Sequence, residues 1–192
     1  PVNSEGSSQP RWGLIGGLAL ATALLLLFIA SPNLFFPDAP DTPSFQTIPK
    51  EQSIALYQTH FKRYDLNSTL GGGDADTLFQ NAQAAYTAGN CAGVLELLAP
   101  LLDNANFERR PLALLLQGTC LLDLGKTLAA IETLQQVPPA AARLHEEAQW
   151  YIALAYLAQL QNEKASEILK QIAEAPRHRH YLEAREMLKM VY

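Results

Sequence analysis

The pattern of hydrophobic and polar residues changes twice along the 192-residue chain. Residues 12–31 form a nearly continuous apolar run, and residues 32–49 show no periodicity. From residue 50 onward, apolar residues recur at steps of three and four, which is typical of helices with a buried face. The sequence therefore predicts an all-α protein that begins with an apolar segment of a different kind.

The apolar segment has the length of a membrane span. Residues 12–37 carry no charge, and the 18 residues 13–30 would form a helix of about 27 Å. The hydrocarbon layer is about 30 Å thick, whereas the apolar core of a secretory signal peptide is only about 7–15 residues long. We therefore expect a short N-terminal tail at residues 1–11 and a single transmembrane helix at residues 12–31.

Charges and small residues around this span predict its orientation and packing. Arg11 precedes it and Asp38 is the first charge after it, which places the N-terminus in the cytoplasm and the rest on the periplasmic side of the inner membrane. Gly13, Gly17 and Ala21 lie at intervals of four, a pattern that lets helices approach closely in lipid. The alternative is that these glycines only reflect the composition of membrane helices.

Two segments separate the span from the rest of the chain. Residues 32–49 contain five prolines and are predicted to be a semi-rigid spacer. Residues 50–73 are predicted to be an amphipathic helix that ends in a glycine hinge, Gly71–Gly73. The apolar residues of this helix are Ile54, Tyr57, Phe61 and Tyr64.

From residue 74 the sequence repeats itself. Small residues of a first helix fall 36 and 35 residues apart, at Ala82, Gly118 and Ala153. The matching positions of a second helix have the same spacing, at Val94, Ala130 and Ala165. Prolines follow near the end of each unit, at Pro100, Pro138 and Pro176. A spacing held at independent positions indicates an array of helical hairpins.

These units resemble the tetratricopeptide repeat (TPR), whose period is about 34 residues. The residues that carry the resemblance are Ala82, Tyr86, Gly89 and Leu98, then Gly118, Leu122, Gly125, Ala130 and Pro138, then Trp150, Ala153, Tyr156, Ala165 and Pro176. Leu160 departs from the pattern, since it stands where the turn glycine belongs. The resemblance implies an α-solenoid over residues 74–192, with three degenerate hairpins (about 74–103, 108–139 and 144–175) and a capping helix (177–192).

The overall plan resembles bacterial inner-membrane proteins with an N-terminal span and a short TPR domain, which are mostly assembly or scaffold factors. The resemblance implies a membrane-anchored protein–protein interaction module, an accessory or assembly subunit of a larger membrane complex. The alternative is the extracytoplasmic sensor or regulatory part of a bitopic signalling protein. A cytoplasmic domain before Pro1 would favour that alternative.

In TPR arrays the first helix of each repeat lines a concave groove. The resemblance assigns eight residues to it: Phe79, Gln83, Tyr86, Leu115, Thr119, Leu122, Trp150 and Leu154. TPR modules that clamp a carboxylate use lysine and asparagine there, and this chain has neither residue at those eight positions. An apolar, aromatic groove suits an amphipathic helix or an apolar extended segment of a partner protein. Two alternatives are that residues 50–64 fill the groove, or that its residues are simply core.

Composition limits the remaining chemistry. A net charge of −5 and a pI near 5.3 exclude the basic surface that nucleic acid requires. With only two cysteines, Cys91 and Cys120, the chain is neither a disulfide-dense scaffold nor a cysteine-rich metal site. A disulfide between neighbouring repeats is expected if the domain is outside the cytoplasm, and two buried thiols are the alternative.

No combination of residues indicates catalysis. His145, in "RLHEEAQW", lacks the second histidine of a zinc-protease helix and reads as a solvated helix start. The "RHRH" stretch, residues 177–180, is either a site for an anion or acidic partner or a solvated connection. We therefore expect no enzyme activity, cofactor, metal or small-molecule substrate. The expected partners are other protein subunits and, through residues 12–31, the lipid bilayer.

Overall fold

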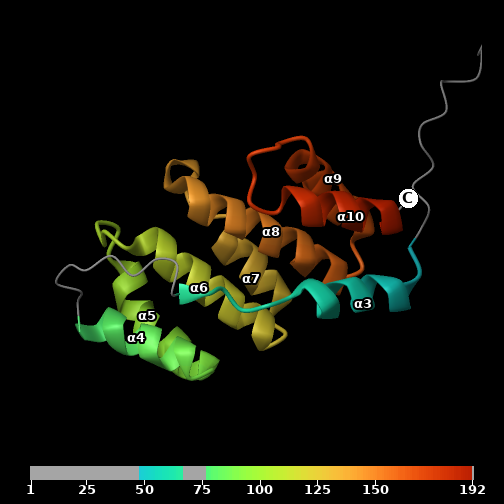
Figure 1. The fold of residues 1–192 in the computed structure, drawn as a ribbon. Coiled ribbons are helices and arrows are strands. Elements are labelled where there is room, and N and C mark those ends of the chain that lie inside the picture. Colours follow the sequence, from blue (N-terminus) through green and yellow to red (C-terminus); the bar gives the residue numbers. More distant parts are fainter. Residues whose placement is uncertain (1–47, 67–76, 192) are drawn as a thin grey trace, which may run out of the picture. The chain divides into compact units, whose positions relative to one another are not determined.

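The computed structural model describes residues 48–66 and 77–191, which lie within one compact unit, Phe45–Tyr192. The regular elements of these two ranges are helices and include no strand, so the all-α prediction is confirmed for them (Figure 1). The α-helices are α3 (Lys50–His60), α4 (Thr77–Thr87), α5 (Cys91–Asp103), α6 (Arg110–Asp123), α7 (Thr127–Leu134), α8 (Ala142–Ala158), α9 (Asn162–Ala173) and α10 (Tyr181–Val191). A short 3-10 helix, η2 (Pro139–Ala141), precedes α8.

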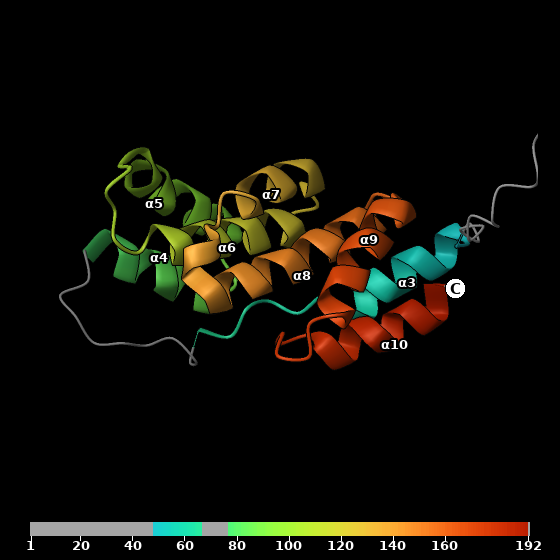
Figure 2. The same cartoon turned by 90° about the horizontal axis from the view of Figure 1, so that it is seen from above.

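After α3 the helices pair into hairpins. Helix α4 packs on α5, α6 on α7 and α8 on α9, and α10 covers α9. Successive hairpins are joined by contacts of α5 with α6 and of α7 with α8. Helices α5, α7 and α9 form one layer, and α4, α6 and α8 form the other (Figure 2). This arrangement is consistent with an α-solenoid of TPR type.

The three hairpins share one turn geometry. Gly89, Gly125 and Leu160 all have positive φ, at 76°, 71° and 60°. Each donates its N–H to the carbonyl three residues earlier, and the following residue donates to the carbonyl five residues earlier. This is the Schellman ending of a helix, which normally uses glycine. Leu160 therefore changes the residue at the turn but not the turn itself.

Small residues let the paired helices approach each other. Ala82 and Ala153 are fully buried, and Gly118 occupies the equivalent position of α6. A Cβ on Gly118 would lie 2.5 Å from Cγ of Leu134 on α7. Because Leu134 is itself 1% exposed, it has no room to move away, and α6 and α7 can only pack this closely with glycine.

Helix α8 is buried on almost every side, since it contacts α3, α6, α7 and α9. Its buried large side chains are Trp150, Tyr151, Ile152, Leu154 and Leu157. A helix with a single apolar stripe can pack on one neighbouring layer, whereas α8 packs on α6, α7 and α9 of the repeats and also on α3. Its apolar sequence is thereby explained.

Helix α3 differs in detail from the sequence prediction. It ends at His60, and residues 61–66 continue without an α-helix. Its buried residues are Ser53 and Leu56, while Ile54 and Tyr57 are half-buried. Burial of the Ser53 hydroxyl is tolerated because its one O–H lies within hydrogen-bond distance of two acceptors, the Leu157 carbonyl on α8 at 3.0 Å and Asn162 Oδ1 on α9 at 2.7 Å. Hydrophobicity alone therefore does not identify the packed face.

The predicted membrane span at residues 12–31 lies outside the described residues, as do Gly13, Gly17, Ala21 and the glycine hinge. Within the described ranges, each helix is too short or too polar to cross a bilayer.

Candidate functional site

Residues 48–66, here called the strap, lie against one side of the repeats. We call this side the inner face: the surface of α4, α6 and α8 opposite to α5, α7 and α9 (Figures 1 and 2). Four apolar side chains of the strap join the buried core of the repeats: Ile48, Leu56, Tyr64 and Leu66. The strap is therefore packed on the inner face along its whole length.

Three strap side chains donate hydrogen bonds to backbone carbonyls of the repeats. Ser53 Oγ lies 3.0 Å from the Leu157 carbonyl oxygen on α8. Tyr57 Oη donates to the Leu122 carbonyl of α6 over 3.3 Å. Arg63 Nη1 reaches a carbonyl at the end of α4, that of residue 86, over 3.2 Å. The strap thus meets the third, second and first hairpins in that order.

The three acceptors occupy the same position in each hairpin. Tyr86, Leu122 and Leu157 are 36 and 35 residues apart, the period of the repeats. Each of their carbonyls also accepts the N–H of the turn residue three positions later. A carbonyl oxygen has two lone pairs, so a second donor can bind beside the turn. We call these three oxygens the acceptor ladder.

Aromatic side chains strengthen the contact between the strap and α8. Tyr151 Oη donates to the Lys62 carbonyl over 2.7 Å, and its ring packs edge-to-face on Phe61 at 6.1 Å between centroids. Burial raises the pKa of Tyr57 and of Tyr151, and Asp123 adds to the effect on Tyr57. Both phenols therefore remain protonated donors at neutral pH.

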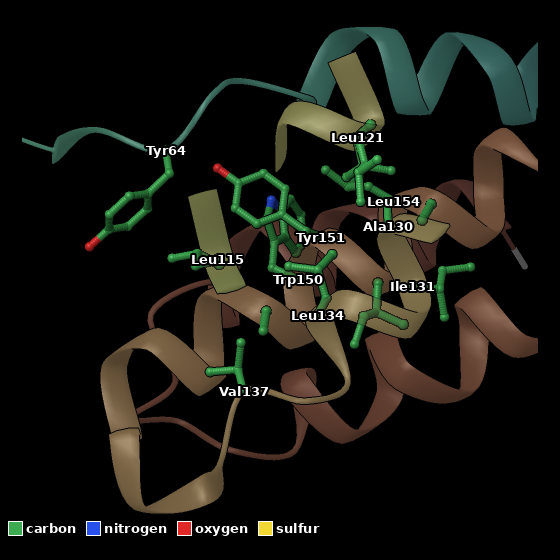
Figure 3. Packing of buried hydrophobic residues seen from close by; sticks show 14 of the residues in the cluster. Tyr64, Leu115, Leu121, Ala130, Ile131, Leu134, Val137, Trp150, Tyr151 and Leu154 are labelled. Carbon is green, nitrogen blue, oxygen red and sulfur yellow. The ribbon is translucent and has the colours of Figure 1, made fainter. Parts of the chain in front are cut away.

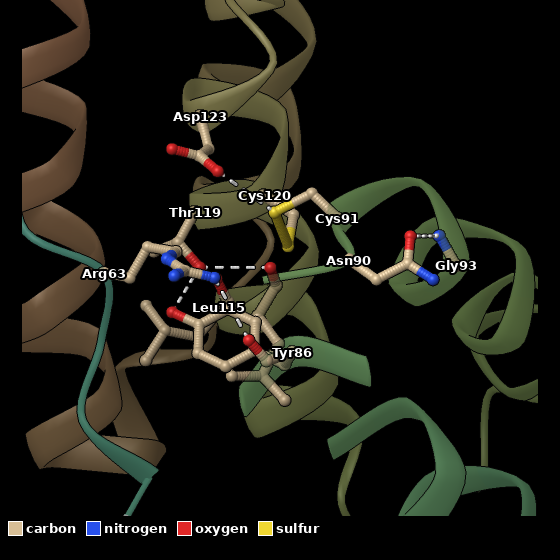
Figure 4. Close-up of a disulfide and its surroundings, with 10 residues drawn as sticks. Arg63, Tyr86, Asn90, Cys91, Gly93, Leu115, Thr119, Cys120 and Asp123 are labelled. Carbon is tan, nitrogen blue, oxygen red and sulfur yellow. Dashed lines mark hydrogen bonds between the residues drawn. A yellow bond between two sulfur atoms is a disulfide. The ribbon is translucent and has the colours of Figure 1, made fainter. Parts of the chain in front are cut away.

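At the other end of the strap, the guanidinium of Arg63 lies 6.0 Å from the ring centroid of Tyr86. The Tyr86 hydroxyl is 3.2 Å from Thr119 Oγ1, which links α4 to α6 (Figure 4). Burial raises the pKa of Tyr86 as well. The end of α4 is therefore held by the strap on one side and by α6 on the other.

The eight residues predicted to line a groove are nearly all buried in the structure. Gln83 is half-buried, and the exposed fraction is 4% or less for Phe79, Tyr86, Leu115, Thr119, Leu122, Trp150 and Leu154. Figure 3 shows Leu115, Trp150 and Leu154 within the core. The strap contacts Tyr86, the Leu122 carbonyl and Trp150. Phe79 instead packs on Phe107. The strap therefore covers part of the predicted groove, whereas Phe79, Leu115 and Leu154 belong to the buried core of the repeats. Binding of a foreign segment stays a prediction.

Cys91, at the start of α5, and Cys120 of α6 are joined in a disulfide, with their Cα atoms 5.0 Å apart (Figure 4). Of the two states that the sequence left open, the structure contains the bridge. Both half-cystines are buried, beside the contact of Tyr86 with Thr119. The bond therefore fixes the first hairpin to the second next to the inner face.

A buried carboxylate anchors the connection between α9 and α10. Glu147 of α8 is 4% exposed and pairs with Arg179 Nε at 2.7 Å and His180 Nε2 at 3.0 Å. The His180 ring stacks on Trp150 at 4.5 Å, and His60 of the strap meets the same indole edge-on at 6.1 Å. The solvated helix start predicted for "RLHEEAQW" is wrong at Glu147, which is buried, while His145 is half-buried. Of the two interpretations of "RHRH", the structure contains the acidic partner, and that partner is Glu147 of the same chain.

Two histidines near this junction resist protonation. His178 is 8% exposed, and its Nδ1 accepts the N–H of His180. Its Nε2 has no hydrogen-bond partner among the described residues. Burial lowers the pKa of His178 and of His60, with Glu146 opposing it for the first and Glu183 for the second. Across the described ranges, no three His, Cys, Asp or Glu side chains gather in a group fit for a metal.

Sequence reasoning missed the strap donors and the acceptor ladder. The acceptors are main-chain atoms, so no residue type marks them. The turn residues could have indicated the acceptors. A Schellman ending in each hairpin places one ladder carbonyl three residues before Gly89, Gly125 and Leu160. The donors Ser53 and Tyr57 stood in a stretch that was read only for its apolar residues.

Two stretches of the chain, residues 112–138 and 147–176, match the family model of the tetratricopeptide repeat. They coincide with the α6–α7 and α8–α9 hairpins, and the α4–α5 hairpin lies outside both. No curated protein and no solved structure matched the chain. The match confirms the resemblance that the repeat spacing indicated.

Proposed function

We propose that this chain serves a larger membrane complex as an anchored accessory or assembly subunit. It belongs to the tetratricopeptide-repeat superfamily through residues 112–138 and 147–176. TPR domains are protein–protein interaction modules, so the partners are other proteins. In this proposal the inner face holds a partner segment, and residues 12–31 keep the module at the membrane.

The observation that carries the proposal is the strap itself. The inner face binds one continuous polypeptide segment across all three hairpins, through apolar side chains and the acceptor ladder. A surface that accommodates a helix followed by an extended stretch has the chemistry for a protein ligand of the same kind.

The proposed periplasmic placement has one further support. Disulfides form and persist in oxidising compartments and are rare in the cytoplasm. The bond between Cys91 and Cys120 therefore favours a domain on the extracytoplasmic side. The apolar, uncharged run at residues 12–31 supplies the anchor in this proposal.

A photo-cross-linking residue at Gln83, which is half-buried on α4 and which the TPR resemblance assigns to the groove, tests the binding of a partner in native membranes. We expect a cross-link to a partner polypeptide that also co-purifies in mild detergent at a fixed ratio. The matched control carries the same residue at Leu182, which is 68% exposed on α10, and should give no such product. Recovery of the chain alone and monomeric, with no product from position 83, would contradict the proposal.

The anchor is tested separately by membrane fractionation. We expect the full chain to resist extraction from membranes with alkaline carbonate, and a variant without residues 12–31 to become extractable. A full chain that is extracted as easily as the shortened variant would contradict the anchoring.

A further inference from the structure

We infer that the strap is a resident ligand of the inner face, which the partner displaces with a segment of the same design. That segment is an amphipathic helix followed by an extended stretch, and it runs antiparallel to the order of the hairpins. It carries hydroxyl or guanidinium donors at the spacing of Ser53, Tyr57 and Arg63. This inference rests on the proposed function and specifies its partner.

The hairpins are complete without the strap. Each turn is closed by its own backbone hydrogen bonds, from Gly89, Gly125 and Leu160 to the ladder carbonyls. When the strap leaves, every ladder oxygen keeps one of its two hydrogen bonds and gains access to water. Leaving a buried acceptor wholly unpaired costs much more than losing one of two bonds. Release is therefore compatible with folded repeats.

The inner face selects its ligand by the positions of the hydrogen-bond donors along it. The ladder consists of main-chain oxygens, so its spacing is set by the repeat period and stays fixed when side chains vary. A serine, a tyrosine and an arginine satisfy the three oxygens in the strap. A segment with the same helix and extended stretch needs donors of similar reach, the second four residues after the first and the third six residues after the second.

Apolar contacts restrict the partner further. Leu56 and Tyr64 of the strap are 6% and 7% exposed, so their release would uncover apolar surface of the inner face. A partner must cover this surface with apolar side chains of its own, since exposure of apolar area to water is unfavourable. This requirement excludes a purely polar peptide and favours an amphipathic helix.

Exchange begins most easily where the strap meets α4. A cavity of about 170 Å³ remains there, and its lining includes Arg63, Tyr64 and Tyr86. At the α8 end, helix α3 packs directly on α8. The incoming segment therefore competes first with the extended end of the strap.

The test uses the full chain in detergent and a fluorescently labelled peptide with the sequence of residues 48–66. A triple variant, Ser53→Ala with Tyr57→Phe and Arg63→Gln, removes the three donors of the resident strap while nearly preserving its shape. The matched control, Gln58→Ala with Thr59→Ala, changes two exposed strap residues. Fluorescence anisotropy measures peptide binding, and circular dichroism melting measures folding.

We expect the triple variant to bind the peptide at least about tenfold more tightly than the wild type or the control. The resident strap of the triple variant loses three hydrogen bonds that the native peptide can still form, and together these correspond to at least about tenfold in affinity. A peptide with the same three substitutions should bind the triple variant at least about tenfold more weakly than the native peptide.

Three results would overturn the inference. Unfolding of the triple variant would mean that the strap is an integral part of the core. An unchanged affinity for the native peptide would mean that the strap does not exchange. Equal binding of native and substituted peptides would mean that the acceptor ladder does not select the ligand.

The partner itself is tested by cross-linking from Gln83 in membranes. If the partner competes with the strap, the triple variant should raise the yield of the cross-linked product several-fold over the control variant. An unchanged yield would overturn the displacement by the partner, while the product itself would still support the proposed function. Loss of the product in every variant would instead contradict the proposed function.

Discussion

At the α8 end of the inner face the strap is a helix, whereas at the α4 end it is an extended segment. Helix α3 packs on α8 and buries Ser53 and Leu56. At α4, the contacts of the strap include Arg63 on the carbonyl and ring of Tyr86, beside a cavity of about 170 Å³. The strap therefore meets α8 as a packed helix and α4 as an extended segment beside a cavity.

The hairpins at the two ends are also secured differently. The α4–α5 hairpin is joined to α6 by the bond between Cys91 and Cys120. The α8–α9 hairpin is joined to the segment before α10 by the pairing of Glu147 with Arg179 and His180. One end is thus secured by a covalent bond and the other by buried ionic hydrogen bonds. The predictions below perturb the two ends separately, from the largest expected effect to the smallest.

Loss of the disulfide should have the largest effect and should act at the α4 end. Replacing Cys91 and Cys120 by alanine removes a disulfide between residues that are 29 positions apart in the sequence. We expect this to lower the free energy of unfolding by about 3–4 kcal/mol. Urea denaturation with and without reductant measures this loss, and hydrogen exchange should locate faster opening in α4 and α5. A wild-type protein that is equally stable in reductant would contradict the prediction.

Substitution Glu147→Gln should act at the α8 end. It removes the charge that pairs with Arg179 and His180 in a buried position, so we expect a loss of about 2 kcal/mol in the free energy of unfolding. The control is Glu186→Gln, because the pair of Glu186 with Lys189 is exposed and should contribute less than about 1 kcal/mol. Similar losses in both variants would contradict the prediction.

The fold was more predictable than the site. The repeat period located the hairpins because small residues and turn residues must recur wherever helices pack closely, as at Ala82, Gly118 and Ala153. The contact of the strap was not predictable in detail, because Ser53 is a polar residue on the packed face of α3. Burial of Glu147 was missed because its partners, Arg179 and His180, lie more than 30 residues away in the sequence.

The pH dependence of stability should also arise at the α8 end. The pKa of His60 and of His178 is lowered in the folded protein, so the unfolded chain binds protons more readily. Stability is then fully present above about pH 6.5 and falls as the pH drops through the lowered pKa values, by at most about 1.4 kcal/mol per pH unit for each group.

Substitution His178→Asn isolates one of these two groups. Asparagine can keep an acceptor for the His180 N–H and removes the titration. Histidine titrates between about pH 5 and pH 8, so urea denaturation should be measured across this range. The free energy of unfolding should fall less steeply with decreasing pH in this variant than in the wild type. An unchanged slope would exclude His178 as a source of the pH dependence.

The smallest effects should come from the turns, where the hairpin at the α8 end has Leu160 and the other two hairpins have glycine. Leu160 holds φ at 60°, where a side chain is unfavourable, so Leu160→Gly should raise the free energy of unfolding by about 0.5–1 kcal/mol. Gly125→Ala should lower it by about 1 kcal/mol through backbone strain alone, because the new Cβ would meet nothing within 4 Å. Thermal unfolding measures both, and equal signs would contradict the prediction.

The central claim is that the strap lies on the inner face in register with the repeats. Intramolecular photo-cross-linking of the full chain, mapped by mass spectrometry, tests it most directly. A photo-reactive residue in place of Tyr57 should cross-link to α6 of the same chain, and one in place of Arg63 to α4. Cross-links from position 57 to α4, or from either position to a second copy, would contradict the claim.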